Sequence, residues 1–247
     1  MKAVLLATGL ARTPDSNGTR SAARHRPPTI RPLIDLAIES FAQAGFGEVG
    51  VVLHDNQGLL QRYLEDSSRY GVGVYTMRND SGARGRAASV LAARIFVGGE
   101  PFVLALEAGH LNPGRLQDLS RLAWAPCALL AHRFRSRHGA LGSHARLWLD
   151  AHGRVERAGL ELERWNALAE EVYLFQPDVF RVISALLQAP DSHCSIVQLV
   201  CHFIRSGQLP QACLPEAGRS DLSWMVGGGR CSLPVLSVPF SPERISV

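Results

Sequence analysis

Lysine is nearly absent from this 247-residue chain, since Lys2 is the only one and all the other basic residues are arginines. Any mechanism that places a lysine inside a binding pocket therefore has a single candidate. Charged residues make up 19% of the chain, aromatic residues only 7%, and the mean hydropathy is +0.02. These values are typical of a globular protein that is slightly poor in charge, and the chain is long enough to bury a core without disulfides or metals.

The sequence also lacks a disulfide framework and a membrane span. The cysteine count is odd, at five, and no CxxC motif occurs. This usage indicates a reducing compartment, so we expect a cytoplasmic protein. No apolar stretch approaches the 18 residues of a spanning helix, and the apolar run after Lys2 is too short for a secretory signal. A membrane partner is therefore not expected.

The net charge of +4 and the pI of about 9.0 raise the question of nucleic-acid binding. The arginines are spread along the chain, with one denser stretch from Arg133 to Arg157 that also holds several histidines. No platform of alternating aromatic and basic residues accompanies them, as single-strand binding would require. A basic nucleic-acid-binding protein is kept as an alternative function, and the stretch is interpreted first as a solvated loop.

The first half of the chain alternates strands and helices. Short apolar runs predict strands at 2–7, 48–54, 71–77 and 102–106, and amphipathic spacing predicts helices at 33–44, 57–70 and 87–96. This rhythm indicates βαβ units and a parallel sheet. The second half predicts a helix at 116–123, a strand at 127–132, a hairpin at 146–157, a strand at 171–175, and helices at 177–187 and 195–206.

The fold class expected from this pattern is α/β, with a Rossmann-like, mostly parallel sheet flanked by helices and a smaller β-containing lobe. We expect one domain over residues 1–235, with a first half at 1–123 and a second half at 124–235. A tail over 236–247 follows.

Several segments occur in the order of a known family's motifs. LLATGLAR is similar to the Gly-rich loop LAAGxGxR, and IRPLIDLAIESFAQAG is similar to a Gly-Arg-Pro-Leu-Ile-Asp helix start. Gly85 to Val90 is similar to a Gly-Asn-Ala-Ala-Ser-Leu segment, and Ala108 to Leu111 to Gly-Asp-His-Leu. DAHGRVERAGLEL and AEEVYLFQPDVF match two further strands. The chain thus resembles the nucleotidyltransferases that act on sugar and alditol phosphates, in particular inositol-phosphate and related cytidylyltransferases, and the resemblance implies their nucleotide-diphospho-sugar transferase-like fold.

The resemblance also implies a site. In that family a Gly-rich loop approaches the nucleotide phosphates, a lysine and an arginine neutralise them, and two aspartates hold Mg²⁺. The implied nucleotide-binding residues are Ala7, Gly9, Arg12, Arg24, Gly85 and Ser89, and the implied acceptor-side residues are His110 and Glu171.

The charges that the family uses for chemistry are missing here. Two lysine positions fall near Ala23 and on Leu160, and four aspartate positions fall on Gly109, Ala169, Val226 and Gly228. Glu107, two residues before Gly109, is the one substitute carboxylate that strand alternation offers. We therefore expect no metal site, with Mg²⁺ as a cofactor only if Glu107 takes part in a rearranged one.

The leading hypothesis is a catalytically impaired member of this family. It would keep residual nucleotide or phosphosugar binding and act in regulation or scaffolding, with an active paralogue or a second copy of itself as partner. The first alternative is an active transferase with a rearranged Mg²⁺ site, and the second is the nucleic-acid-binding protein.

One further pattern of cysteine and histidine occurs in the sequence, His193-Cys194 with Cys201-His202. It is interpreted as buried cysteines on an amphipathic helix rather than a zinc site.

Overall fold

The computed structural model describes residues 1–7, 33–53, 58–79, 85–107, 111–133, 144–188 and 192–215. Several residues of the expected site lie outside this part of the chain: Gly9, Arg12, Arg24, Gly109, His110, Val226 and Gly228. The expected tail at 236–247 lies outside it as well.

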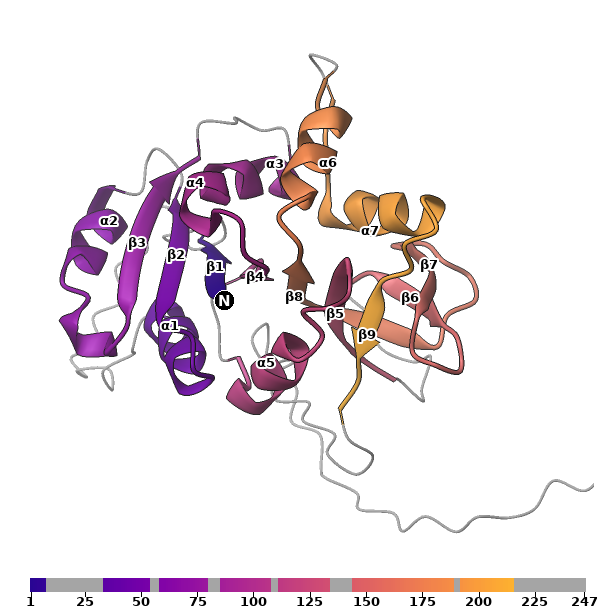
Figure 1. The fold of residues 1–247 in the computed structure, drawn as a ribbon, viewed down its shortest axis with the longest axis horizontal. Helices are drawn as coiled ribbons and strands as arrows, with labels where there is room; N and C mark the ends of the chain where they lie inside the picture. The colour runs from indigo at the N-terminus through magenta and orange to yellow at the C-terminus, as the bar shows by residue number, and fades with distance from the viewer. Residues whose placement is uncertain are drawn as a thin grey trace, which may run out of the picture.

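The described residues form a nine-stranded sheet in the order β3-β2-β1-β4-β8-β5-β9, which Figure 1 shows from left to right. Its strands are β1 (Lys2–Leu6), β2 (Glu48–Leu53), β3 (Gly73–Arg78), β4 (Phe102–Ala105), β5 (Cys127–His132), β8 (Ala167–Phe175) and β9 (Gln211–Cys213). The β1, β2, β3 and β4 strands run parallel, and β8 runs antiparallel to both β4 and β5. The mostly parallel sheet expected from the sequence is confirmed.

The other two strands, β6 (Arg146–Leu149) and β7 (Val155–Gly159), form the predicted hairpin, and β6 pairs with the start of β8. Its turn is built by Asp150, whose carboxylate accepts hydrogen bonds from the backbone N–H groups of His152 and Arg154. Gly153 has φ +77°, which a β-branched or bulky residue rarely adopts. In the described part of the chain, the hairpin strands β6 and β7 lie outside the strand order β3-β2-β1-β4-β8-β5-β9.

Helices cover both faces of the sheet. They are α1 (Leu33–Gln43), α2 (Gly58–Glu65), α3 (Arg86–Val90), α4 (Arg94–Val97), α5 (Pro113–Ser120), α6 (Val179–Leu186) and α7 (Ile196–Arg205), with 3-10 turns η1 (Ser68–Tyr70) and η2 (Leu91–Ala93). Side chains alternate along β1, so Val4 and Leu6 join the core under α3, α6 and α7, whereas Ala3 and Leu5 join the core under α1 and α5. Two apolar cores result, one on each face.

Several elements differ from the predicted bounds. The α5 helix begins at Pro113, before the predicted start, because the Asn112 side chain caps it by accepting from the Arg115 N–H and proline suits the first helical position. The predicted helix at 87–96 is broken into α3, η2 and α4. The β8 strand begins at Ala167 because β5 and β6 both pair with its first residues.

Candidate functional site

The candidate site lies at the edge of the sheet where the parallel strands end. The Ala7 N–H, just after β1, donates to the Val52 carbonyl at 3.0 Å, and the Asn79 N–H, just after β3, donates to the Leu53 carbonyl at 2.8 Å. These bonds hold the ends of three strands at one edge. In open α/β sheets ligands bind in the crevice outside the carboxyl ends of the strands, so this edge is the candidate site.

The start of α3 is fixed at this edge by a close backbone contact. Gly85 has φ +98°, and a Cβ on it would lie 2.4 Å from the carbonyl oxygen of Cys194 and 2.9 Å from the imidazole of His193. That carbonyl accepts a hydrogen bond from the Ala87 N–H at 3.1 Å. Only glycine fits at 85, and the contact sets the position of the next residue, Arg86.

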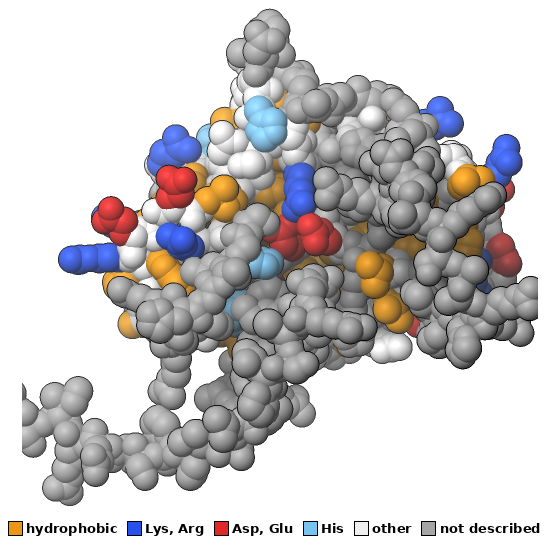
Figure 2. All heavy atoms as spheres, turned by 180° about the vertical axis from the view of Figure 1, so that it is seen from behind, with side chains coloured by type: hydrophobic (Ala, Val, Ile, Leu, Met, Phe, Trp, Pro, Cys, Tyr) orange, Lys and Arg blue, Asp and Glu red, His pale blue; other side chains and the backbone are white. Residues whose placement is uncertain are grey.

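Arg86 joins two carboxylates that come from different strands. Its Nη1 donates to Glu171 on β8 at 2.6 Å, and its Nη2 donates to Glu107, just after β4, at 3.0 Å. The Leu106 N–H donates to the Glu171 carbonyl at 2.9 Å, which keeps the two glutamates at neighbouring points of the edge. Figure 2, a view from behind, shows acidic and basic side chains side by side near the middle of that face.

The sequence predicted two of these three residues as site residues, Glu107 and Glu171, and it missed Arg86. A signal was present, because Arg86 stands where the similar family segment has asparagine. Burial raises the pKa of Glu171 above its ordinary value, and the negative charge of Glu107 raises it further, while Arg86 opposes both effects.

The carboxylates of Glu170 and Glu171, which are adjacent on β8, lie on opposite faces of the sheet, because strand side chains alternate. Glu171 lies on the α3 face, and Glu170 lies on the α5 face, where it pairs with Arg115 and lies 3.6 Å from His132 Nδ1. Arg115 also donates to the carbonyls of Ala131 and Cys213. This second cluster ties α5 to β5, β8 and β9, so it stabilises the sheet rather than forming part of the edge site.

Ser89 is buried on α3, where its hydroxyl accepts a hydrogen bond from the side-chain amide of Asn79 at 2.7 Å. Asn79 directly follows β3, so this bond links the strand end to the helix that carries Arg86. The sequence predicted Ser89 as a nucleotide-binding residue and missed Asn79. A polar residue two positions after a strand predicted to end at residue 77 was the signal for it.

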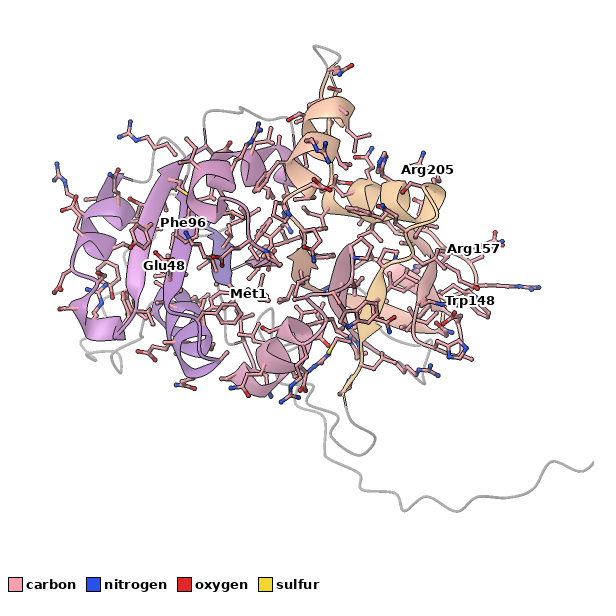
Figure 3. The ribbon with its side chains drawn as sticks, viewed as in Figure 1. Met1, Glu48, Phe96, Trp148, Arg157 and Arg205 are labelled. Atoms are coloured by element: carbon pink, nitrogen blue, oxygen red, sulfur yellow. The ribbon has the colours of Figure 1, made fainter. Side chains whose placement is uncertain are left out.

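The only lysine lies at the opposite edge. Lys2 begins β1, and its Nζ donates to the Phe96 carbonyl at 2.7 Å and lies 3.4 Å from the Glu48 carboxylate. Figure 3 labels Glu48 and Phe96, which lie beside each other near the start of the chain. About 13 Å of strand separates Lys2 from Leu6 at the candidate site.

Two of the lost charges fall on described residues. Ala169, at a family aspartate position, is 3% exposed and belongs to the apolar core on the α7 face. Leu160, at a family lysine position, is 54% exposed beyond the end of β7. Burying a carboxylate at Ala169 would require a partner that this apolar core does not provide.

Cysteine and histidine side chains were the other metal candidates in the sequence. Cys194 is buried in the core, and the Cys201 thiol lies 3.3 Å from the Ala158 carbonyl. Within the described ranges, no three His, Cys, Asp or Glu side chains gather so that they could hold a metal ion.

The described part of the arginine-dense stretch, residue 133 and residues 144–157, holds four arginines and two carboxylates. One of each, Arg154 and Asp150, forms an ion pair at 2.7 Å. On the face in Figure 2, basic side chains are dispersed among acidic ones. On this face the described arginines therefore do not form a continuous basic patch of the kind that non-specific nucleic-acid binding uses.

Comparison with known proteins identifies sequence neighbours. No model of a protein family matches the chain. The chain is 26% identical over 235 residues to a glucose-1-phosphate thymidylyltransferase of Streptomyces antibioticus, which covers 90% of this chain and 62% of the relative. It is 34% identical over 89 residues to a low-salt glycan biosynthesis nucleotidyltransferase of Haloferax volcanii, covering 36% of this chain and 25% of that protein. The matched region thus spans about six-tenths and a quarter of the lengths of these relatives.

Solved structures show the same fold at 16% identity. The inositol-1-phosphate CTP transferase from T. maritima superposes with a TM-score of 0.68, covering 86% of this chain and 84% of that one. A putative glucose-1-phosphate thymidylyltransferase from Bacillus anthracis gives 0.67, with 87% of each chain covered. A UDP-glucose pyrophosphorylase bound to UDP-glucose gives 0.64, with 85% and 89% covered. The sequence and structural neighbours are therefore nucleotidyltransferases, and the fold is the nucleotide-diphospho-sugar transferase type.

Among the helices of the described ranges, none is long and apolar enough to cross a membrane.

Proposed function

We propose that the chain binds a nucleotide or a phosphosugar at the carboxyl edge of its sheet and has lost most or all nucleotidyl transfer. The observation that carries this proposal is the position of Lys2, the only lysine, at the amino edge and bonded there to Phe96 and Glu48. No lysine of this chain is therefore available to neutralise a triphosphate. Phosphoryl transfer depends almost entirely on positioning and electrostatics, so losing these charges removes the mechanism.

We propose that the two halves of a single domain over 1–235 contact different parts of the ligand. The half at 1–123 supplies the nucleotide contacts through Ala7, Gly85 and Ser89, and through Gly9, Arg12 and Arg24. The half at 124–235 contributes Glu171 on the acceptor side, together with His110 from the first half. The names of the neighbours, which include glucose-1-phosphate and inositol-1-phosphate transferases, favour a sugar or alditol phosphate as the acceptor-side ligand.

We propose a regulatory or scaffolding role in the cytoplasm, beside an active paralogue or in an assembly of identical copies. Similarity of fold supports the architecture of the domain but does not support a catalytic activity.

An active transferase with a rearranged Mg²⁺ site is the second candidate. The convergence of Glu107 and Glu171 on one point of the edge favours it, since two carboxylates can share a divalent cation. This function requires Arg86 to leave both carboxylates when substrate binds.

The deciding experiment measures binding and turnover in the same samples. The full chain is heated with CTP, UTP, GTP or ATP, and with inositol 1-phosphate or glucose 1-phosphate, in EDTA and in Mg²⁺. A ligand at 100 times its Kd stabilises the fold by about 2.7 kcal/mol, which raises the Tm by roughly 5–10 °C in a domain of this size. We expect such a shift in EDTA, with pyrophosphate release at background.

Two other results would replace the proposal. Pyrophosphate release in Mg²⁺ that Glu107→Ala abolishes would establish the active transferase. Binding to random DNA that weakens steeply with salt would establish the nucleic-acid function.

A pair of serine variants tests the location of the ligand. Ser89→Ala removes a buried hydroxyl beside the proposed nucleotide contacts, and we expect it to lower nucleotide affinity by roughly fivefold, which is the value of one hydrogen bond. Ser40→Ala is the matched control, because Ser40 is also buried but lies near the end of α1, and its hydroxyl donates to the Leu36 carbonyl. Equal effects of the two variants would show that Ser89 acts through stability alone.

A further inference from the structure

We infer that Arg86 supplies, as a fixed part of the chain, the positive charge that a divalent cation would supply between Glu107 and Glu171. Binding at this edge is then independent of divalent cations. The ligand part of this inference rests on the proposed function, whereas the ion part concerns the protein without any ligand.

Each terminal nitrogen of the guanidinium contacts a different carboxylate. Nη1 lies 2.6 Å from Glu171 Oε2 and Nη2 lies 3.0 Å from Glu107 Oε1. Oxygen atoms held by two nitrogens of one planar guanidinium are close neighbours, and a cation between two carboxylates offsets their mutual repulsion. Arg86 provides that cation, and arginine remains protonated at every physiological pH.

These donors do not fit a divalent cation while Arg86 stands between them. Mg²⁺ requires near-octahedral oxygen ligands at about 2.0–2.1 Å, and a cation at that point would lie against the guanidinium. The described part of the chain brings no third His, Cys, Asp or Glu into a metal-binding group here.

Two features hold Arg86 in place. Its helix begins at Gly85, which packs directly against the Cys194 carbonyl, so the backbone has little freedom to withdraw. The Glu171 side chain is 24% exposed, whereas that of Glu107 is 61% exposed. Ion pairs between exposed groups contribute little to stability, so the pair with Glu171 holds the Arg86 side chain more strongly than the pair with Glu107 does.

The sequence shows the same exchange of charge. In the similar family segments, a neutral asparagine stands at position 86 and an aspartate at position 109, and here they are Arg86 and Gly109. Position 86 has thus gained a positive charge, which reduces the attraction of the edge for a metal ion. The chain also lacks the negative charge at position 109.

The test measures Mn²⁺ binding to the full chain by electron paramagnetic resonance, with no nucleotide present. We expect weak binding by the wild type and binding at least about tenfold tighter by Arg86→Gln, because two carboxylates then face each other without a cation. Adding Glu171→Gln to that variant should abolish the gain. Arg86→Lys, which keeps the charge, should behave as the wild type.

The matched control is Arg121→Gln, which breaks an exposed ion pair with a single carboxylate, that of Asp118. It should leave Mn²⁺ binding unchanged. The inference is overturned if the wild type binds Mn²⁺ as tightly as Arg86→Gln, or if Arg86→Gln, shown to be folded by circular dichroism, gains no Mn²⁺ binding.

Ligand binding supplies the second readout. If a nucleotide or phosphosugar binds the wild type, its Kd should agree within about twofold in EDTA and in Mg²⁺, whereas a metal-bridged ligand would lose most of its affinity in EDTA. Absence of any ligand binding would refute the proposed function and leave the Mn²⁺ comparison to decide the role of Arg86.

Discussion

The backbone of Gly85 lies directly against the carbonyl oxygen of Cys194, at a distance where a Cβ on residue 85 would approach that oxygen to 2.4 Å. The contact joins the start of α3 to the segment that leads into α7. It is a relationship between residues 109 positions apart in the sequence, and it places Arg86 at the edge of the sheet.

Gly85→Ala should therefore destabilise the fold. The Gly85 backbone (φ +98°, ψ 164°) lies in a region that essentially only glycine adopts, which costs an L-residue about 1–3 kcal/mol, and overlap with the Cys194 carbonyl adds about 1–3 kcal/mol. Chemical denaturation should show the loss of roughly 2–6 kcal/mol. Gly71→Ala is the control, because Gly71 also has a positive φ but no atom lies within 4 Å of the point that a Cβ on it would occupy. Equal losses in the two variants would mean that the Cys194 contact contributes nothing.

Arg115→Ala should cost about 3 kcal/mol, because it leaves the largely buried carboxylate of Glu170 without its arginine partner. The variant also removes the donors to two backbone carbonyls. Arg121→Ala on the same α5 helix should cost less than about 1 kcal/mol, since its pair with Asp118 is exposed. Urea denaturation compares the two, and a similar cost for both would contradict the structural role of the Glu170 cluster.

Stability should fall as the pH rises above about 10, the ordinary pKa of tyrosine. Burial and a hydrogen bond to Asp35 raise the pKa of Tyr70, and the bond to Asp35 also raises the pKa of Tyr63. A raised pKa means that the folded state keeps protons that the unfolded state releases. The resulting stability is present below the unfolded pKa and is lost as the pH rises toward the folded one.

Denaturation midpoints between pH 9 and about 11 measure this loss. Tyr70→Phe should make the alkaline decline shallower, whatever its effect at neutral pH. Tyr75→Phe, on the exposed face of β3, serves as control. An unchanged decline in Tyr70→Phe would show that this phenol does not cause it.

Lys2→Met should leave nucleotide or phosphosugar affinity within about twofold of the wild type, because Lys2 is bonded at the far edge of the sheet. The variant loses the hydrogen bond to the Phe96 carbonyl, so stability should fall by about 1 kcal/mol. Isothermal calorimetry and denaturation separate the two effects. A large loss of affinity at full stability would place Lys2 in the site and contradict the proposed function.

Local patterns were sufficient to predict most of the elements. The β5 strand matches its predicted bounds at 127–132, and α7 lies within the helix predicted at 195–206, with a capping box of Ser195 and Gln198 at its start. Apolar periodicity and capping are properties of neighbouring residues, so a single sequence reveals them. The β9 strand was not predicted, because three residues at 211–213 carry no periodicity and owe their strand conformation to pairing with β5.

The candidate site could be predicted only in part. Motif similarity pointed to Gly85, Ser89 and Glu171, and strand alternation pointed to Glu107; all four lie at the carboxyl edge. It did not point to Arg86, because the role of an arginine depends on which carboxylates the fold brings to it. Those carboxylates are 21 and 85 residues away in the chain.

The sequence by itself determined that this is an α/β chain with one lysine and with apolar or small residues at six charged positions of a similar family. Composition and local periodicity contain that information. Only the tertiary structure decided that the lysine lies at the amino edge of the sheet and that Arg86 joins two carboxylates at the carboxyl edge. The reason is physical: electrostatic contacts depend on distances in space, and strand pairing and helix packing set those distances.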